Sequence, residues 1–284
     1  MQQSIFSVDV EDWFHILDIP RAPRIAEWNS LPSRVEKNFS RLLDIFSEKN
    51  VEVTCFFLGW IAERYPHLVK EAASRGHEIA SHGYGHELVY EQSRQDFYDD
   101  VRRARLLLED ISSDAVVGYR APGFSTTEET PWFFDALAEA GYHYDSSVFP
   151  APRGHGGMRE SQRTPHRMGN GDGILEVPIT VTDLLGWPMC FCGGGYLRLF
   201  PYWLIHRMAE RVLAEGRPVV FYVHPRELDP AHPRLPMGRV RHFKSYVNLE
   251  TTETKIRRIL QDFPVSTFRN VISANPQLVN THVA

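Results

Sequence analysis

Short apolar segments alternate with amphipathic segments along most of this sequence. In residues 34–49 the apolar side chains recur every three or four positions, which predicts a helix with one buried face. Residues 53–58 are rich in β-branched and aromatic side chains, which favours a strand. Elements that alternate in this order form parallel strands joined by right-handed crossovers. The pattern therefore predicts an α/β protein with a barrel-like or open sheet.

Further helices and strands can be placed along the rest of the chain. Ser93, which is followed three residues later by Asp96, is typical of a helix N-terminus. A helix predicted at residues 131–140 has Pro131 at its start and Gly141 just beyond its end. Other strands are predicted at residues 4–10, 77–81, 116–119, 142–145, 174–179, 219–223 and 265–269, and other helices at residues 62–74, 201–214 and 251–262.

The length of the chain fits one large domain. It has 284 residues, of which 43% are hydrophobic, and these are enough to build one extensive core. We therefore expect a single domain over residues 1–284. Residues 150–173 are rich in Gly, Pro, Arg and His and are predicted to form a long loop. The oligomeric state is not indicated by the sequence.

Charge and hydropathy restrict the partners of the protein. The net charge is −5 and no basic segment typical of nucleic-acid-binding proteins is evident, so we expect no nucleic-acid partner. No segment approaches the roughly 18 apolar residues of a membrane-spanning helix, so no integral membrane segment is expected. The first residues lack the basic and apolar regions of a signal peptide, which predicts a cytoplasmic location.

Clusters of polar residues follow four of the predicted strands. In parallel α/β proteins, functional sites are built at the carboxyl ends of the strands. The clusters are therefore expected to meet at one edge of the sheet. They lie at residues 9–12, 82–86, 120–122 and 224–225.

Two of these clusters together have the composition of a metal site. His82 and His86 enclose two glycines, which favour a turn that directs both imidazoles to one point. Two histidines and one carboxylate form a common open metal site, and Asp9, Glu11 and Asp12 supply carboxylates. Alternation along a strand would place Asp9 and Glu11 on one face and Asp12 on the other. An isolated histidine pair is more often a surface feature, so the carboxylates carry the argument.

Four motifs in a fixed order resemble those of one enzyme family. Together they are similar to the motifs of the NodB-homology polysaccharide deacetylases, which form carbohydrate esterase family four. Residues 224–230, with residues 241–243, resemble a subgroup often found in exopolysaccharide loci, including those linked to exosortase systems. The resemblance covers nearly the whole chain, and the part near residues 225–284 would be specific to the subgroup. The motifs are FSVDVEDW at residues 6–13, GHEIASHGYGH at 76–86, GYRAP at 118–122 and FYVHP at 221–225.

The resemblance implies a deformed (β/α) barrel and one divalent metal ion, commonly zinc. His82 and His86 match the family's metal ligands. The usual adjacent pair of aspartates is replaced by the sequence DVED at residues 9–12. The spacing seen in some relatives favours Glu11 as the metal carboxylate, whereas residue type favours Asp12, and both stay open. Gly83 also departs from the family, which usually has a hydroxyl residue after the first histidine.

The resemblance also assigns the acid–base residues. Asp9 matches the general base, and Arg120 matches the arginine that pairs with the base carboxylate. His224 matches the general acid, and Asp145 lies near the motif that orients it. A backbone N–H near residues 144–146 is expected to stabilise the oxyanion.

The activity implied by the resemblance is metal-dependent N-deacetylation of an amino sugar. The enzyme would be a hydrolase of linear amide bonds, and its partner would be an N-acetylated saccharide, either a polysaccharide or a precursor. One alternative is a related metal-dependent amidohydrolase or deformylase with a non-polymeric substrate. Another is an inactive saccharide-binding domain, but the residues whose loss would indicate one are all present. Aromatic side chains expected to stack on sugar rings are Trp13, Phe14, Tyr84, Phe124, Phe149, Trp187 and Tyr196.

Overall fold

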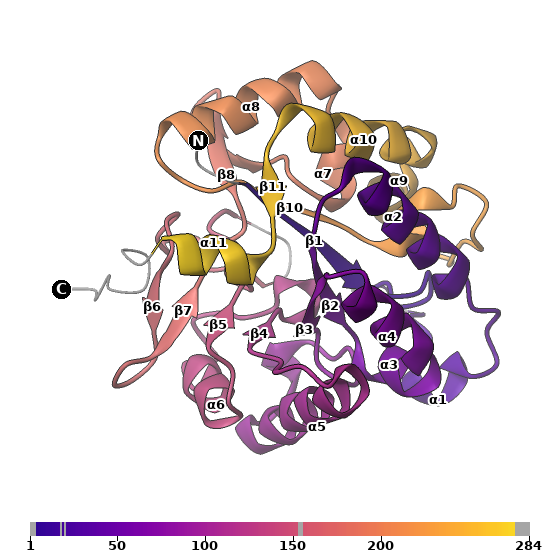
Figure 1. Ribbon diagram of the computed structural model, residues 1–284, viewed down its shortest axis with the longest axis vertical. Helices are drawn as coiled ribbons and strands as arrows, with labels where there is room; N and C mark the ends of the chain where they lie inside the picture. The colour runs from indigo at the N-terminus through magenta and orange to yellow at the C-terminus, as the bar shows by residue number, and fades with distance from the viewer. Residues whose placement is uncertain (1–3, 18, 20, 153–155, 276–284) are drawn as a thin grey trace.

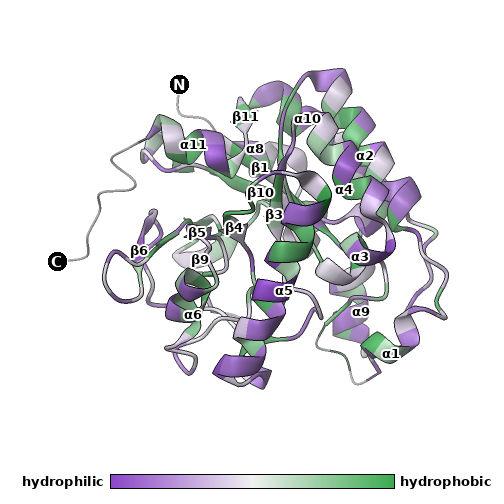
Figure 2. Ribbon diagram, turned by 60° about the horizontal axis from the view of Figure 1, so that its bottom comes forward, coloured by the Kyte–Doolittle hydropathy of each residue, from purple (hydrophilic) through white to green (hydrophobic). Residues whose placement is uncertain are grey.

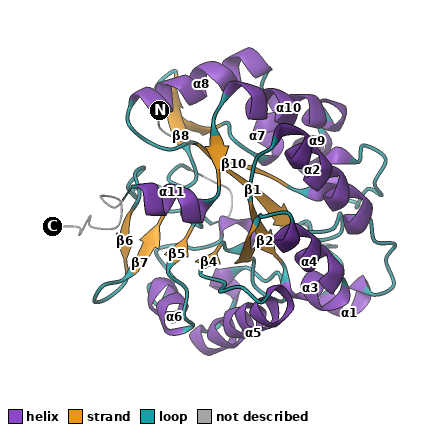
Figure 3. Cartoon of the chain, in the orientation of Figure 1, coloured by secondary structure: helices purple, strands orange, loops and turns teal. Residues whose placement is uncertain are grey.

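A curled sheet of mostly parallel strands organises the structure (Figures 1 and 3). The computed structural model describes residues 4–17, 19, 21–152 and 156–275. Nine strands form this sheet in the order β10-β1-β2-β3-β4-β5-β7-β6, with β11 paired to β1. The strands are β1 Ser4–Val10, β2 Thr54–Phe57, β3 Glu78–Ser81, β4 Gly118–Tyr119, β5 Tyr144–Asp145, β6 His166–Met168, β7 Ile174–Glu176, β10 Val220–Val223 and β11 Val265–Ser266.

The direction of the strands confirms the predicted α/β fold. Every neighbouring pair in this sheet is parallel except β6 and β7, which are antiparallel. The sheet curls into a half-barrel whose outermost strands in this order are β10 and β6. A second, two-stranded antiparallel sheet joins β8 (Val181–Leu184) to β9 (Trp187–Cys190).

Helices cover the outer side of the curled sheet. In Figure 2 their outward surfaces are mainly hydrophilic, whereas the central strands are hydrophobic. Among the described residues, no helix is long and apolar enough to cross a membrane. The helices are α1 Ile25–Trp28, α2 Val35–Lys49, α3 Gly59–Arg64, α4 Pro66–Ser74, α5 Arg94–Ser112, α6 Phe133–Glu139, α7 Gly194–Leu199, α8 Tyr202–Ala214, α9 Arg239–Tyr246, α10 Thr252–Asp262 and α11 Phe268–Ala274.

Strand β1 is the centre of the molecule. All seven of its residues are buried, and it pairs with β10 on one side and β2 on the other. Its first residues also pair with β11. One hydrophobic core extends through the chain from Ile5 to Val271. Residues at the carboxyl end of β1 therefore start from a rigid, fully paired position.

Helix α5 forms as the sequence predicts. The Ser93 hydroxyl accepts a hydrogen bond from the N–H of Asp96 at 3.2 Å, which satisfies one of the free amides at the helix start. Its buried side is the predicted apolar stripe. That stripe consists of Phe97, Val101, Ala104 and Leu108.

Several predicted elements are shorter in the structure, and two differ in kind. The helix predicted at residues 62–74 is two helices, α3 and α4, which meet at Tyr65. Pro66 disfavours a helical backbone at the preceding residue, so the chain turns there. The strand predicted at residues 265–269 ends after two residues, because the Thr267 hydroxyl accepts from the N–H of Asn270 and starts helix α11.

The segment predicted as a long loop contains a short strand. Within residues 150–173, strand β6 pairs with β7, which follows it in the chain. Residues 153–155 of this segment lie outside the described part of the chain. The β8–β9 hairpin and helices α7 and α9 were not predicted either.

Candidate metal centre and active site

Three side chains converge beyond the carboxyl ends of β1 and β3. Nε2 of His82 lies 3.0 Å from Oε1 of Glu11, and Nε2 of His86 lies 2.9 Å from the same oxygen. All three side chains are buried, and their possible ligand atoms lie within 4.8 Å of one another. Glu11 enters the cluster through a tight turn, in which its N–H donates to the carbonyl of Asp9. The structure thus contains a possible metal-binding triad.

The hydrogen bond from Nδ1 of His82 determines whether its Nε2 directs a proton or a lone pair at Glu11. Nδ1 lies 2.8 Å from the carbonyl oxygen of Arg120, and because a carbonyl only accepts, Nδ1 carries the proton. In the neutral ring Nε2 then directs a lone pair at the carboxylate, which is repulsive unless a cation lies between them. Burial alone would raise the pKa of Glu11, but His86 and other facing imidazoles hold it well below its usual value. This donor set fits a divalent metal ion.

The loop that carries both histidines is held by Asp100 of helix α5. The carboxylate accepts hydrogen bonds from the N–H groups of Tyr84 at 2.7 Å and Gly85 at 2.8 Å. Gly83 has a φ of +72°, and a Cβ there would lie 2.9 Å from Asp100 Oδ2, so both the conformation and the contact favour glycine. His86 itself has a φ of +55°, in the left-handed region. The loop therefore depends on this carboxylate to direct the imidazoles inward.

The other possible metal carboxylate, Asp12, points away from the histidines. Its Oδ2 accepts from the Ser33 hydroxyl at 2.6 Å, and its carboxylate also accepts from the N–H groups of Arg34 and Val35. These amides lie at the start of α2, so Asp12 acts as a helix cap from a distant part of the chain. Burial raises the pKa of Asp12, although these hydrogen bonds offset part of the effect.

Arg120 joins the carboxylate of Asp9 to the loop after β5. Its Nη1 lies 2.7 Å from Asp9 Oδ1 and 2.8 Å from the Ser7 hydroxyl, both on β1. Its Nε donates to the carbonyl of Ser146 at 3.2 Å, and its guanidinium lies over the ring of Phe56. The side chain is fully buried. A buried guanidinium with this many partners holds the Asp9 carboxylate in one orientation.

His224 follows β10 and faces the same cluster. Its Nε2 lies 3.8 Å from Asp9 Oδ2 and 4.0 Å from Glu11 Oε1. Its other nitrogen, Nδ1, lies 3.3 Å from Oε2 of Glu227. Burial would lower the pKa of His224, but Glu11 and Glu227 raise it above its usual value. The His224 side chain is 14% exposed, more than any other member of the cluster. Solvent therefore reaches the cluster from the side of His224.

Asp145 ends strand β5 and contacts the loop that follows it. Its carboxylate accepts from the hydroxyl of Ser147 at 2.6 Å and from the N–H of the same residue at 3.1 Å. It also hydrogen-bonds the side chain of Glu176 on β7. Its described contacts therefore shape the loop that holds Arg120, and the carboxylate beside His224 is that of Glu227.

The amides expected to stabilise an oxyanion are engaged elsewhere. The N–H of Tyr144 donates to the carbonyl of Val117, and that of Ser146 donates to the carbonyl of Tyr119. Both bonds belong to the pairing of β5 with β4. These two amides therefore do not face the site, and the expectation of an oxyanion donor near residues 144–146 stays a prediction.

Most of the aromatic side chains expected to stack on sugars are core residues instead. Five of them are at most 8% exposed, and all of these except Tyr84 belong to the hydrophobic core. Trp187 is 67% exposed but lies on the β8–β9 hairpin. The buried five are Trp13, Phe14, Tyr84, Phe124 and Phe149.

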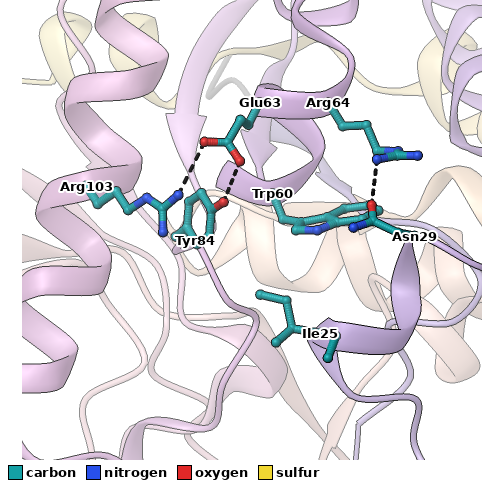
Figure 4. A pocket seen from close by; sticks show the side chains of 8 residues that line it. Ile25, Asn29, Trp60, Glu63, Arg64, Tyr84 and Arg103 are labelled. Atoms are coloured by element: carbon teal, nitrogen blue, oxygen red, sulfur yellow. Dashed lines mark hydrogen bonds and ion pairs between the residues drawn. The ribbon is translucent and has the colours of Figure 1, made fainter.

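A cavity of about 480 Å³ adjoins Tyr84, which lies between the two histidines in the sequence (Figure 4). Trp60 and Tyr84 form part of its lining. The polar groups around it bind one another, since Glu63 accepts from the Tyr84 hydroxyl at 2.7 Å and from Arg103 at 3.2 Å. Arg64 donates to Asn29 on the opposite side, and none of these residues belongs to the metal-binding triad.

Three residues of the site were not predicted from the sequence. Asp100 is distant in sequence from the loop it holds, and no local pattern marks it. Glu227 does have a local signal, because a glutamate three residues after His224 has the spacing of a capping box. The ring centroid of His15 lies 5.5 Å from that of His86. Burial, and after it the nearby His86, lowers the pKa of His15 well below its usual value. It is therefore neutral beside the metal ligands.

Two family models match adjacent parts of the chain. Residues 28–144 match the family described as polysaccharide deacetylase, and residues 146–273 match a domain of unknown function, DUF3473. The first region contains both histidines of the cluster and Arg120. The second contains His224 and Glu227.

Individual relatives agree with the first match. A peptidoglycan deacetylase of Helicobacter pylori is 28% identical over 113 residues, which are 40% of this chain and 38% of that protein. This chain spans less than half the length of the curated relatives that it matches. A candidate polysaccharide deacetylase from Mycobacterium smegmatis has a similar fold, with a TM-score of 0.64 and 21% identity over 99% of this chain and 93% of that one. The allantoinase PuuE has a TM-score of 0.63 and 15% identity over 97% and 90%.

Proposed function

Because residues 28–144 match the polysaccharide deacetylase family, we propose that the chain hydrolyses the N-acetyl group of an amino sugar with the help of one divalent metal ion, such as zinc. The substrate would be an N-acetylated polysaccharide or saccharide precursor. The observation that carries this proposal is the buried convergence of Glu11, His82 and His86 beside Asp9 and His224. A location in the cytoplasm and a role in exopolysaccharide biosynthesis stay predictions.

The metal would be held by Glu11, His82 and His86. When bound there, such an ion polarises an acyl carbonyl and acidifies water. His82 is prepared for this role by its bond to the carbonyl of Arg120, which leaves Nε2 free to coordinate. Asp12 would not be a ligand, because its oxygens are occupied at the start of α2.

Asp9 and His224 would divide the proton transfers between them. Asp9, fixed by Arg120 at 2.7 Å, takes a proton from the water that attacks the acetyl carbon. His224 donates a proton to the sugar nitrogen as the C–N bond breaks, so acetate and a free amine are the products. The 3.8 Å between His224 Nε2 and Asp9 Oδ2 supports this division, because two groups so close could both contact one acetamide.

Acetate release from N-acetylated saccharides tests the proposal. Protein loaded with one equivalent of zinc should release acetate from N-acetylglucosamine oligomers, and chelator-treated protein should not. A cyclic ureide serves as the competing substrate, because an allantoinase shares the fold. Turnover of the cyclic ureide without acetate release from any amino sugar would replace this proposal with the amidohydrolase alternative.

A further inference from the structure

Glu227 contacts the ring nitrogen of His224 that faces away from the metal cluster. We propose that Glu227, held in turn by Arg198, is the positioning residue that directs His224 toward the leaving nitrogen of the substrate. This inference rests on the proposed function, because it concerns the residue that donates the proton. It also gives the region matched by the family of unknown function a part in the reaction, since all three residues lie within residues 146–273.

The contacts of Glu227 fix both the backbone and the ring of His224. Oε2 accepts the backbone N–H of His224 at 3.0 Å and lies 3.3 Å from Nδ1 of the same residue. Pro225 and Glu227 belong to a short 3₁₀ helix, Pro225–Leu228, for which His224 is the N-cap. With Nδ1 held by the carboxylate, Nε2 has one direction left, which is toward Asp9 and Glu11.

Arg198 of helix α7 keeps the Glu227 carboxylate in place. Its Nη1 lies 3.2 Å from Oε1, the oxygen that does not contact His224, and both side chains are almost fully buried. Arg198 is itself anchored, because its guanidinium donates to the carbonyls of Lys244 and Ser245 on α9. A buried carboxylate needs such a cation to remain charged. Burial would raise the pKa of Glu227, but Arg198 and His224 lower it to about 2.

A role as a helix cap alone would not explain this arrangement. A cap requires only the bond from Glu227 to the backbone N–H of His224. It does not require the second contact, to Nδ1, nor a buried arginine on the other oxygen. Asp145 does not supply this contact among the described residues, because its carboxyl is used by Ser147 and Glu176.

The test compares two substrates whose leaving groups differ. An amine leaves an N-acetylglucosamine oligomer only with a proton, whereas 4-nitrophenolate leaves an activated acetate ester without one. Glu227→Gln should therefore lower kcat for the oligomer by roughly 10- to 100-fold, part of the usual value of a general acid, with KM little changed. The rate with the ester should stay within about twofold of wild type, because no step of that reaction needs the acid.

Further variants separate positioning from a general loss of structure. Glu227→Asp keeps the charge but withdraws it from Nδ1, so it should show the same selective loss to a smaller degree, even if Glu227→Gln does not fold. His224→Ala should show a larger loss, and adding Glu227→Gln to it should have no further effect. Glu78→Gln is the matched control, since Glu78 is an equally buried glutamate at the opposite end of the strands. Its ratio of the two rates should equal that of wild type.

Two results would overturn the inference. One is an equal loss with both substrates in Glu227→Gln and Glu227→Asp, which would indicate a structural role. The other is a wild-type ratio in both variants. Failure of the wild-type enzyme to release acetate from any amino sugar is a different result, because it rejects the proposed function and the inference with it.

Discussion

At the scale of single residues, two neighbouring carboxylates have different surroundings. Glu11 Oε1 meets both imidazoles, whereas Asp12 binds backbone amides at the start of α2. Glu11→Gln should weaken zinc binding by more than about 100-fold, since even outer contacts of metal ligands contribute 10- to 100-fold. His82→Ala should lose metal and activity together. Metal content after gel filtration measures the zinc that each variant retains, and acetate release measures its activity.

Asp12→Asn is the matched control for Glu11→Gln. It should keep the metal but lower the free energy of unfolding by about 0.5–2 kcal/mol, the usual cost of losing a helix cap. Urea denaturation measures this change. Loss of metal in Asp12→Asn, with full occupancy in Glu11→Gln, would reverse the two assignments.

Asp9 provides a second prediction at this scale. Asp9→Asn should keep the zinc yet lower kcat by roughly 10²- to 10⁴-fold, because an amide cannot accept the proton. Its contact with Arg120 is retained through the amide oxygen, so the fold should be unchanged. Activity in Asp9→Asn close to that of wild type would exclude Asp9 as the base.

The sequence identified the types of residue in this site better than their contacts. The histidine spacing and the cluster at residues 9–12 indicated a metal site, but β1 ends at Val10, so alternation along the strand does not extend to Glu11 and Asp12. The tight turn at Glu11 and the distant amides of Arg34 and Val35 distinguish them, and both are tertiary features. For the same reason the sequence pointed to Asp145 as the residue near the motif that orients His224, and not to Glu227, which contacts it.

At the scale of elements, helix α5 holds the histidine loop through one carboxylate. Asp100→Ala removes two hydrogen bonds to the backbone of the loop and should weaken zinc binding by roughly 10- to 100-fold. Asp99→Ala is the control, because Asp99 lies on the exposed side of the same helix. Calorimetric titration of zinc measures both variants. Equal zinc affinities in Asp100→Ala and Asp99→Ala would show that the loop keeps its conformation without Asp100.

The pairing of β5 with β7 brings the carboxyl groups of Asp145 and Glu176 together, which predicts a pH dependence of stability. Burial, together with the nearby Asp145, raises the pKa of Glu176 well above its usual value. Because the folded protein binds the Glu176 proton more tightly than the unfolded chain does, this proton stabilises the fold fully below the usual glutamate pKa of 4.5. The stabilisation is lost as the pH rises toward the raised pKa of Glu176 in the folded protein. The free energy of unfolding should therefore fall as pH rises above the usual glutamate pKa of 4.5, and less so in Glu176→Gln. Equal slopes in the two proteins would contradict this.

Elements were predicted well where local chemistry decides them. The cap at Ser93 and the apolar stripe of α5 are local, and β1 was predicted with its observed bounds. The break at Pro66 and the cap at Thr267 were also visible in the sequence but were outweighed by the apolar pattern around them. Strand β6 could not be predicted, since a three-residue strand depends on its partner β7.

At the scale of the whole molecule, both matched regions contribute strands to one sheet. Strand β1, which precedes the first region, pairs with β2 in the first region and with β10 and β11 in the second. A fragment of residues 1–145 should therefore show no cooperative unfolding by circular dichroism, and neither should a fragment of residues 146–284. Cooperative unfolding of either fragment would show that the two regions are independent domains.

The position of β1 has a consequence for synthesis on the ribosome. Ser7 bonds to Phe221, 214 residues later, so β1 leaves the exit tunnel long before the strand that completes its pairing. At roughly 5–20 residues per second this delay is about 10–40 s, during which an apolar strand has an open edge. Nascent chains stalled before β10 should therefore recruit chaperones, and chains released after β11 should not. Asp9 and Glu11 leave the tunnel early but can meet His224 only near the end of translation.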